Sequence, residues 1–200
     1  HRCLQAFHGE VDGLPGPFTD RLTAARREEA EALLQRISRA VFAADLEDNF
    51  LHRGWLQRWQ EKIPAYLDWQ IEREAQWQVA GVEIKATHEL PLPGITLQGR
   101  LDRLDSDGHQ QAIVDYKTGH IPAIDEVESG EAVQLPFYAL LNEGNMEVRQ
   151  VSYLALDQAK VKEKLALEEE ELHELSRAIG ERLTTLVDKM RGGAKFPAWG

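Results

Sequence analysis

The feature that most constrains this chain is a change of hydrophobic period near residue 76. From residue 19 to about residue 76, apolar residues recur at the three- and four-residue spacing of amphipathic helices. After that point, segments 79–92, 95–105 and 112–117 are rich in β-branched residues and partly alternate between apolar and polar, which is typical of strands. This order predicts one mixed α/β domain with a helical N-terminal part.

The helical part divides into two stretches. Thr19 or Asp20 can cap the first, and Gly54 or Pro64 is expected to break or kink the second. Aromatic side chains at helical spacing usually belong to a core. We therefore interpret four tryptophans as core residues: Trp55, Trp59, Trp69 and Trp77.

The strand-rich part predicts a meander followed by helices and one more strand. A turn at residues 106–109 joins the second strand to the third. Residues 132–141 are then predicted to form a helix that tolerates Pro136 in its first turn. Residues 148–156 are predicted to form a fourth strand. Residues 167–190 read as a charged amphipathic helix, with acidic residues near its N-terminus where the helix dipole favours them.

Composition narrows the class of protein. The 200 residues contain 23 Lys and Arg against 34 Asp and Glu, a formal charge of −11, which argues against a protein that coats nucleic acid. An enzyme that holds a cation among carboxylates is still allowed. The single cysteine, Cys3, excludes an internal disulfide framework and favours a reducing, cytoplasmic setting. Neither a membrane span nor a signal peptide is visible, and the start at His1 without methionine predicts a fragment of a longer protein.

Residues that could carry chemistry gather on the second and third predicted strands. Because side chains alternate along a strand, Asp115 and Lys117 should point to one face and Tyr116 to the other. The turn between the strands can bring Asp102 within one or two positions of Asp115. Two carboxylates suit a hard cation such as Mg²⁺, and a neighbouring ammonium can orient or help deprotonate an attacking water.

A bare Asp-x-Lys pair is more often an exposed ion pair than a catalytic one. Here it occurs together with a Gly-x-x-Asp segment and with Gln134 and Tyr138, which are four residues apart and share one face of the next predicted helix. This combination favours a functional site.

At these positions the sequence resembles the RecB-like nucleases of the PD-(D/E)xK superfamily. Within that superfamily it is similar to the C-terminal nuclease domain of AddB-type helicase-nuclease subunits and to related bacterial probable DNA repair proteins. The matching segments are GRLDRLD at 99–105, IVDYKTG at 113–119 and QLPFY at 134–138.

The resemblance implies a restriction-endonuclease-like fold, with a mixed central β-sheet flanked by helices. It also assigns expected roles to individual residues. Asp102 and Asp115 would be metal-binding aspartates, Lys117 the catalytic lysine, and the main-chain carbonyl of Tyr116 a further ligand. His1 would take the place of a histidine that binds the metal. Gln134 and Tyr138 would contact the DNA strand. In the nuclease hypothesis itself, Arg100 or Arg103 is also expected to position the strand.

The family also has an upstream glutamate, for which this sequence offers two candidates. Glu83 and Glu89 share strand parity, so alternation does not separate them. Glu83 is preferred because it follows a short apolar run, as in the family. Many related domains end with cysteines that bind an iron–sulfur cluster; any such ligands would lie outside this chain.

The sequence therefore predicts a Mg²⁺- or Mn²⁺-dependent DNA nuclease domain over residues 1–200, with a helical part at 1–76 and a nuclease core at 77–200. The resemblance implies an exonuclease that acts on single-stranded ends, supplied by a helicase subunit or domain, in bacterial cytoplasmic DNA repair. The alternative is a catalytically silent nuclease-like domain that serves as a DNA-binding or subunit-docking scaffold.

Overall fold

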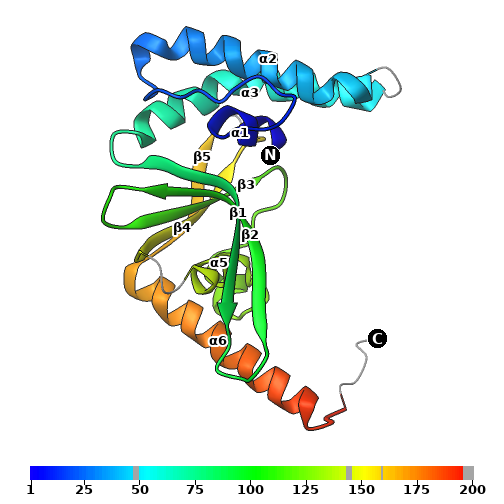
Figure 1. The fold of residues 1–200 in the computed structure, drawn as a ribbon, viewed down its shortest axis with the longest axis vertical. Helices are drawn as coiled ribbons and strands as arrows, with labels where there is room; N and C mark the ends of the chain where they lie inside the picture. The colour runs from blue at the N-terminus through cyan, green and yellow to red at the C-terminus, as the bar shows by residue number, and fades with distance from the viewer. Residues whose placement is uncertain (47–49, 143–145, 159, 196–200) are drawn as a thin grey trace.

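The computed structural model describes residues 1–46, 50–142, 146–158 and 160–195, and its elements form three layers (Figure 1). A five-stranded sheet lies between an N-terminal layer of helices and two later helices. The helices are α1 (Arg2–His8), the 3-10 turn η1 (Ala24–Arg26), α2 (Arg27–Leu46), α3 (Phe50–Arg73), α4 (Ile124–Glu128), α5 (Gln134–Leu141) and α6 (Glu169–Arg191). The strands are β1 (Gln78–Glu89), β2 (Thr96–Ser106), β3 (Gln111–Lys117), β4 (Val148–Ala155) and β5 (Lys162–Glu168).

The sheet is mixed, as the sequence predicts. Its strands follow chain order, β1-β2-β3-β4-β5, and all neighbours are antiparallel except β3 and β4. The parallel pair is joined by a crossover that contains α4 and α5. This crossover places α5 against the sheet, beside the carboxyl end of β3.

Two apolar clusters hold the layers together. The first joins α1, α2 and α3 to Val114, Tyr116 and Leu154 on one face of the sheet. The second joins α5 and α6 to Ile113, Val151 and Tyr153 on the other face. Neighbouring residues of β3 therefore contribute to opposite cores, as expected for a strand buried on both sides. No helix among the described residues is long and apolar enough to cross a membrane.

The helical layer differs from the sequence expectation in three places. The first long helix begins at Arg27 and not near Thr19, because the preceding segment is held by Glu74, the residue that follows α3: the Leu22 backbone amide donates to Glu74 Oε2 at 2.8 Å. Pro64 lies inside α3 without ending it, and Gly54 does not end it either. Trp69 and Trp77 are core residues as predicted, whereas the Trp55 side chain is exposed.

The fifth strand was not predicted. Residues 162–168 (KEKLALE) carry helix-favouring Lys, Glu, Leu and Ala, and residue 167 was expected to begin the last helix. In the structure this segment pairs with β4, for example Val151 with Leu167, and the helix begins at Glu169. Tertiary pairing therefore overrides local helix propensity here.

The β1–β2 hairpin extends beyond the rest of the sheet. Strand β3 pairs with β2 only from Arg103 to Ser106, whereas β1 and β2 stay paired out to Glu89 and Thr96. We call residues 84–101 the arm; it projects away from the N-terminal helices in Figure 1. One face of the arm packs on α5, where a side chain at Gly99 would meet Leu141 Cδ1 at 2.5 Å.

A buried ionic network joins α3 to the sheet. The Asp105 carboxylate accepts hydrogen bonds from Arg103 Nε at 2.6 Å and from Arg73 Nε at 2.5 Å. Arg103 also donates to Gln70 Oε1, and Arg73 to Glu163 Oε1, each at 2.6 Å. The Arg103 and Asp105 side chains are fully buried. Two carboxylates, Asp105 and Glu163, face the two guanidinium groups, so the network compensates the charge that folding buries.

The imidazole of His8 lies beside this network and makes folding sensitive to acid. Burial and the Arg103 charge lower the pKa of His8 well below its ordinary value, and its Nε2 lies 2.5 Å from Tyr66 Oη. A group with a depressed pKa stabilises the fold above its unfolded pKa of about 6.5, and this stability is lost as the pH falls below that value.

We therefore expect His8→Gln to reduce the loss of stability below about pH 6.5, by at most ~1.4 kcal/mol per pH unit. Urea unfolding of both proteins between pH 5 and pH 8, two values that bracket the unfolded pKa, measures the difference. His120→Gln, at an exposed loop position, is the control and should keep the wild-type slope. Equal slopes for wild type and His8→Gln would contradict the prediction.

Candidate metal centre and active site

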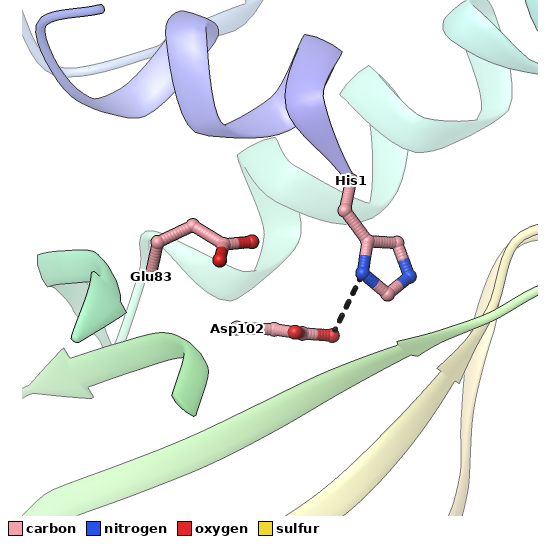
Figure 2. A group of neighbouring side chains, drawn as sticks. All are labelled: His1, Glu83 and Asp102. Carbon is pink, nitrogen blue, oxygen red and sulfur yellow. Dashed lines mark ion pairs between the residues drawn. The ribbon is translucent and has the colours of Figure 1, made fainter. Parts of the chain in front are cut away.

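Three side chains from distant parts of the sequence converge at the base of the arm. One ligand atom each from His1, Glu83 and Asp102 lies within 4.8 Å of the other two. Figure 2 shows that His1 approaches from the start of α1, while the two carboxylates face it from the sheet. An imidazole and two carboxylates form a donor set that a divalent cation can use.

Local backbone structure places the two carboxylates. Asp102 is the residue of β2 just before Arg103, whose pairing with Val114 is the last between β2 and β3. Glu83 has φ 52°, a left-handed conformation that is uncommon for a residue other than glycine. It lies between Val82 and Ile84, which pair with Arg103 and Leu101. Such backbone strain is common at functional sites.

His1 is held by two acceptors. Its Nε2 lies 2.9 Å from the Tyr116 carbonyl oxygen, and its Nδ1 lies 3.4 Å from Asp102 Oδ2. The hydrogen bond with Asp102 raises the pKa of His1 above its ordinary value, more than partial burial lowers it. Both ring nitrogens therefore point at the oxygens that would surround a cation.

Tyr116 connects this group to β3 through its backbone. Its amide donates to Asp102 Oδ2 at 2.9 Å, and its carbonyl faces His1. Its side chain lies on the face of the sheet that α1 and α3 cover, 5.9 Å from the His1 ring between centroids and opposite to Asp115, which contacts α5. This is the alternation that the sequence predicts for Asp115, Tyr116 and Lys117.

Asp115 and Lys117 form a second group, bridged by Gln134. Lys117 Nζ lies 2.8 Å from Asp115 Oδ2 and donates to Gln134 Oε1 at 2.7 Å. The Gln134 amide in turn donates to Asp115 Oδ1 at 2.8 Å. Burial raises the pKa of Asp115, and the Lys117 ammonium opposes that rise while the Asp102 charge adds to it. Asp115 Oδ2 pairs with Lys117 Nζ, and an ionised carboxylate oxygen has a further lone pair that can accept one more ligand.

Two tyrosines border the second group. Gln134 Nε2 lies 2.9 Å from Tyr138 Oη, one helical turn along α5, and burial raises the pKa of Tyr138 to about 12. Tyr153 on β4 was not predicted from the sequence. Its ring lies 5.0 Å from Lys117 Nζ, and burial raises its pKa above the ordinary range. The signal that could have located Tyr153 is the strand–helix–strand crossover, which places β4 next to β3.

The remaining residues that the sequence offered for the site lie at three different places in the structure. Arg100 lies at the edge of the site, where its Nη1 is 3.4 Å from Glu83 Oε2. Glu89 lies near the tip of the arm, opposite Thr96 and away from His1 and Asp102. Arg103 was expected as a contact to the strand, but its side chain is fully buried below α3 and pairs with Asp105. A guanidinium in that position cannot touch a bound strand without unfolding the network.

The chain as a whole is similar to a known protein family. The profile of the PD-(D/E)XK nuclease superfamily matches residues 1–200. No curated protein matches the sequence. Among solved structures, one described as "Crystal structure of SSO0001" is 14% identical, with a TM-score of 0.35 over 92% of this chain and 82% of that one.

Proposed function

The chain belongs to the PD-(D/E)XK nuclease superfamily, and on that premise we propose that it is a divalent-metal-dependent nuclease domain that hydrolyses phosphodiester bonds in DNA. The fold agrees with this family: a mixed five-stranded sheet, flanking helices and a helical N-terminal part. The observation that carries the proposal is the meeting of His1, Glu83 and Asp102 beside the Asp115, Lys117 and Gln134 group.

We propose Asp102, Asp115, Glu83, His1 and the Tyr116 carbonyl as the residues that hold Mg²⁺ or Mn²⁺. The donor set fits, since it combines carboxylate oxygens, an imidazole and a carbonyl. When bound, such a cation lowers the pKa of water and offsets charge on the phosphate.

The other residues of the site would act on the substrate directly. Lys117, held by Asp115 and Gln134, would orient the attacking water and offset negative charge as it develops on the phosphate. Gln134 and Tyr138 present polar groups beside Lys117 and would position the strand. Arg100, exposed at the edge, would contact a neighbouring phosphate.

The finer assignment rests on the motifs in segments 99–105, 113–119 and 134–138. We propose that residues 1–200 are a RecB-like or AddB-like nuclease domain, that it works as an exonuclease on single-stranded ends supplied by a helicase subunit or domain, and that it serves cytoplasmic bacterial DNA repair. Because Cys3 is the only cysteine and is buried, any iron–sulfur cluster would need ligands from outside this chain.

Calorimetric titration with Mn²⁺ tests the metal centre. We expect Glu83→Gln to weaken Mn²⁺ binding by at least the ~10–100-fold that loss of an outer-shell partner costs. Glu89→Gln is the matched control: it makes the same change on the same strand, away from the site, and should bind Mn²⁺ like the wild type. Cleavage of end-labelled single-stranded DNA should require Mg²⁺ or Mn²⁺ and stop on addition of EDTA.

Different outcomes separate the two candidate functions. Metal binding together with metal-dependent cleavage supports the nuclease. Metal binding and DNA binding without cleavage would favour the scaffold. Equal Mn²⁺ affinities for Glu83→Gln and Glu89→Gln would remove Glu83 from the metal centre.

A further inference from the structure

The arm carries a polar face that continues outward from the metal centre. Along residues 84–101, the exposed side chains alternate with side chains that pack toward α5 and α6. Cross-strand pairing arranges the exposed ones in three successive rungs: Lys85 with Arg100, Thr87 with Gln98 and Glu89 with Thr96. The first rung lies next to Glu83 and Asp102, and the Arg100 guanidinium contacts Glu83 at 3.4 Å.

The first rung places two positive charges opposite each other. Like charges directly opposite each other on neighbouring strands are destabilising, yet Lys85 pairs directly with Arg100. No ion pair joins Lys85 to any residue in the described part of the chain. Two cations on one exposed rung, beside a site proposed to hold phosphate, lose their mutual repulsion when an anion lies between them.

The spacing of the rungs suits a repeating anion. Residues on one face of a strand are two positions apart, about 6.7 Å, so the rungs follow one another at that interval over roughly 20 Å from Glu83 to Glu89. The interval is comparable with the separation of successive phosphates in an extended single strand. Thr87 and Gln98 supply neutral hydrogen-bond donors beyond the cationic rung, and the exposed Glu89 carboxylate on the third rung, which repels phosphate, marks the outer end of this surface.

The arm also lacks the features of a base-reading surface. No Phe, Tyr or Trp occurs in residues 84–101, and His88 has the strand parity of the packed side chains, so the exposed face offers bases no aromatic ring on which to stack. Contacts from lysine, arginine, threonine and glutamine to phosphates carry no direct sequence information. Binding along the arm would therefore be independent of base sequence.

From these observations we propose that the exposed face of the arm is a phosphate track that guides single-stranded nucleic acid from the metal centre toward the arm tip, with Lys85 as its principal contact after Arg100. This inference rests on the proposed nuclease function and specifies which surface binds the substrate. Lys85 acts as a positioning residue: it contacts a phosphate that is not cleaved.

Binding of a fluorescent oligothymidylate in EDTA, measured by anisotropy at several salt concentrations, tests the track without any cleavage. We expect Lys85→Ala to weaken binding about 1.5- to 5-fold, the range of an exposed ion pair. The slope of log K against log salt should fall in magnitude by about 0.7, the value for one lost phosphate contact to a single strand. Lys85→Arg should restore both quantities.

Arg39→Ala is the control, because it removes one exposed positive charge from α2, in the N-terminal layer opposite the arm (Figure 1). It should leave affinity and slope unchanged, and oligoadenylate should behave like oligothymidylate. If Lys85→Ala and wild type give the same affinity and salt slope, the track is refuted.

Cleavage assays distinguish this failure from failure of the proposed function. Lys85→Ala should lower kcat/KM for an oligonucleotide and leave kcat/KM for bis(p-nitrophenyl) phosphate unchanged, because that small diester does not reach the arm. An equal loss on both substrates would overturn the positioning role. If wild type cleaves neither substrate, the nuclease function fails, and the salt slope in EDTA still decides whether the arm binds nucleic acid.

Discussion

Replacing Lys117 with methionine is expected to lower the rate of DNA cleavage by about 10²–10⁴-fold, the range of a positioned proton-transfer group. The ammonium touches both Asp115, at 2.8 Å, and Gln134, at 2.7 Å, so it has a fixed position beside the candidate metal ligands. Methionine keeps most of the length of the lysine chain and its apolar packing but removes the charge and all three donors. The loss should appear in kcat measured at saturating DNA.

The control for this substitution is Lys62→Met. Lys62 also donates a hydrogen bond, to the carbonyl of Gln158 at 2.9 Å, but it belongs to α3 and not to the site. It should cleave DNA at the wild-type rate. Mn²⁺ titration of Lys117→Met should still show binding, since Lys117 supplies no metal ligand. Wild-type cleavage by Lys117→Met would remove the lysine from the chemistry.

Local sequence patterns account for much of the site and for the order of elements. Alternation along β3 is sufficient to place Asp115 and Lys117 on one face and Tyr116 on the other, because a strand has a period of exactly two residues. The one-turn spacing of Gln134 and Tyr138 similarly places both side chains on one face of α5, where they contact each other. In both cases the information lies within a few residues.

Features that depend on contacts between distant residues could not be predicted in this way. Glu83 and Glu89 have the same strand parity, and only the left-handed backbone at Glu83 and its closeness to His1 and Asp102 separate them. The segment 162–168 has a helical composition and becomes a strand because β4 offers it a partner. The sequence predicts a third strand shorter than the first two, but the register that leaves the arm unpaired with β3 appears only in the structure.

Arg103 shows how one motif can serve both function and folding. In the segment GRLDRLD, Asp102 belongs to the candidate metal centre, whereas Arg103 and Asp105 lie on the other face, in the buried network with Arg73. Alternation predicts that Asp102 and Asp105 face opposite sides, since they are three residues apart. It does not reveal that α3 covers the second face, which is why Arg103 was expected at the site.

The burial of this network leads to the second large effect that we expect. Asp105→Ala should lower the free energy of unfolding by about 3–5 kcal/mol, because removing one partner of a buried ion pair leaves uncompensated charge in the core. Here a single carboxylate serves both Arg73 and Arg103, whose side chains are 4% and 0% exposed. A loss of this size is a large part of the ~5–15 kcal/mol that stabilises a typical domain.

Urea unfolding followed by tryptophan fluorescence measures this loss, and Asp68→Ala is the matched control. Asp68 also accepts a hydrogen bond from an arginine, Arg27 Nε at 2.8 Å, but its side chain is 61% exposed. Exposed pairs contribute only ~0.2–1 kcal/mol, so the same substitution should cost far less there. The contrast between the two variants isolates burial as the cause, since the residue types and the hydrogen-bonding atoms are alike. Equal losses for Asp105→Ala and Asp68→Ala would show that the network does not hold α3 against the sheet.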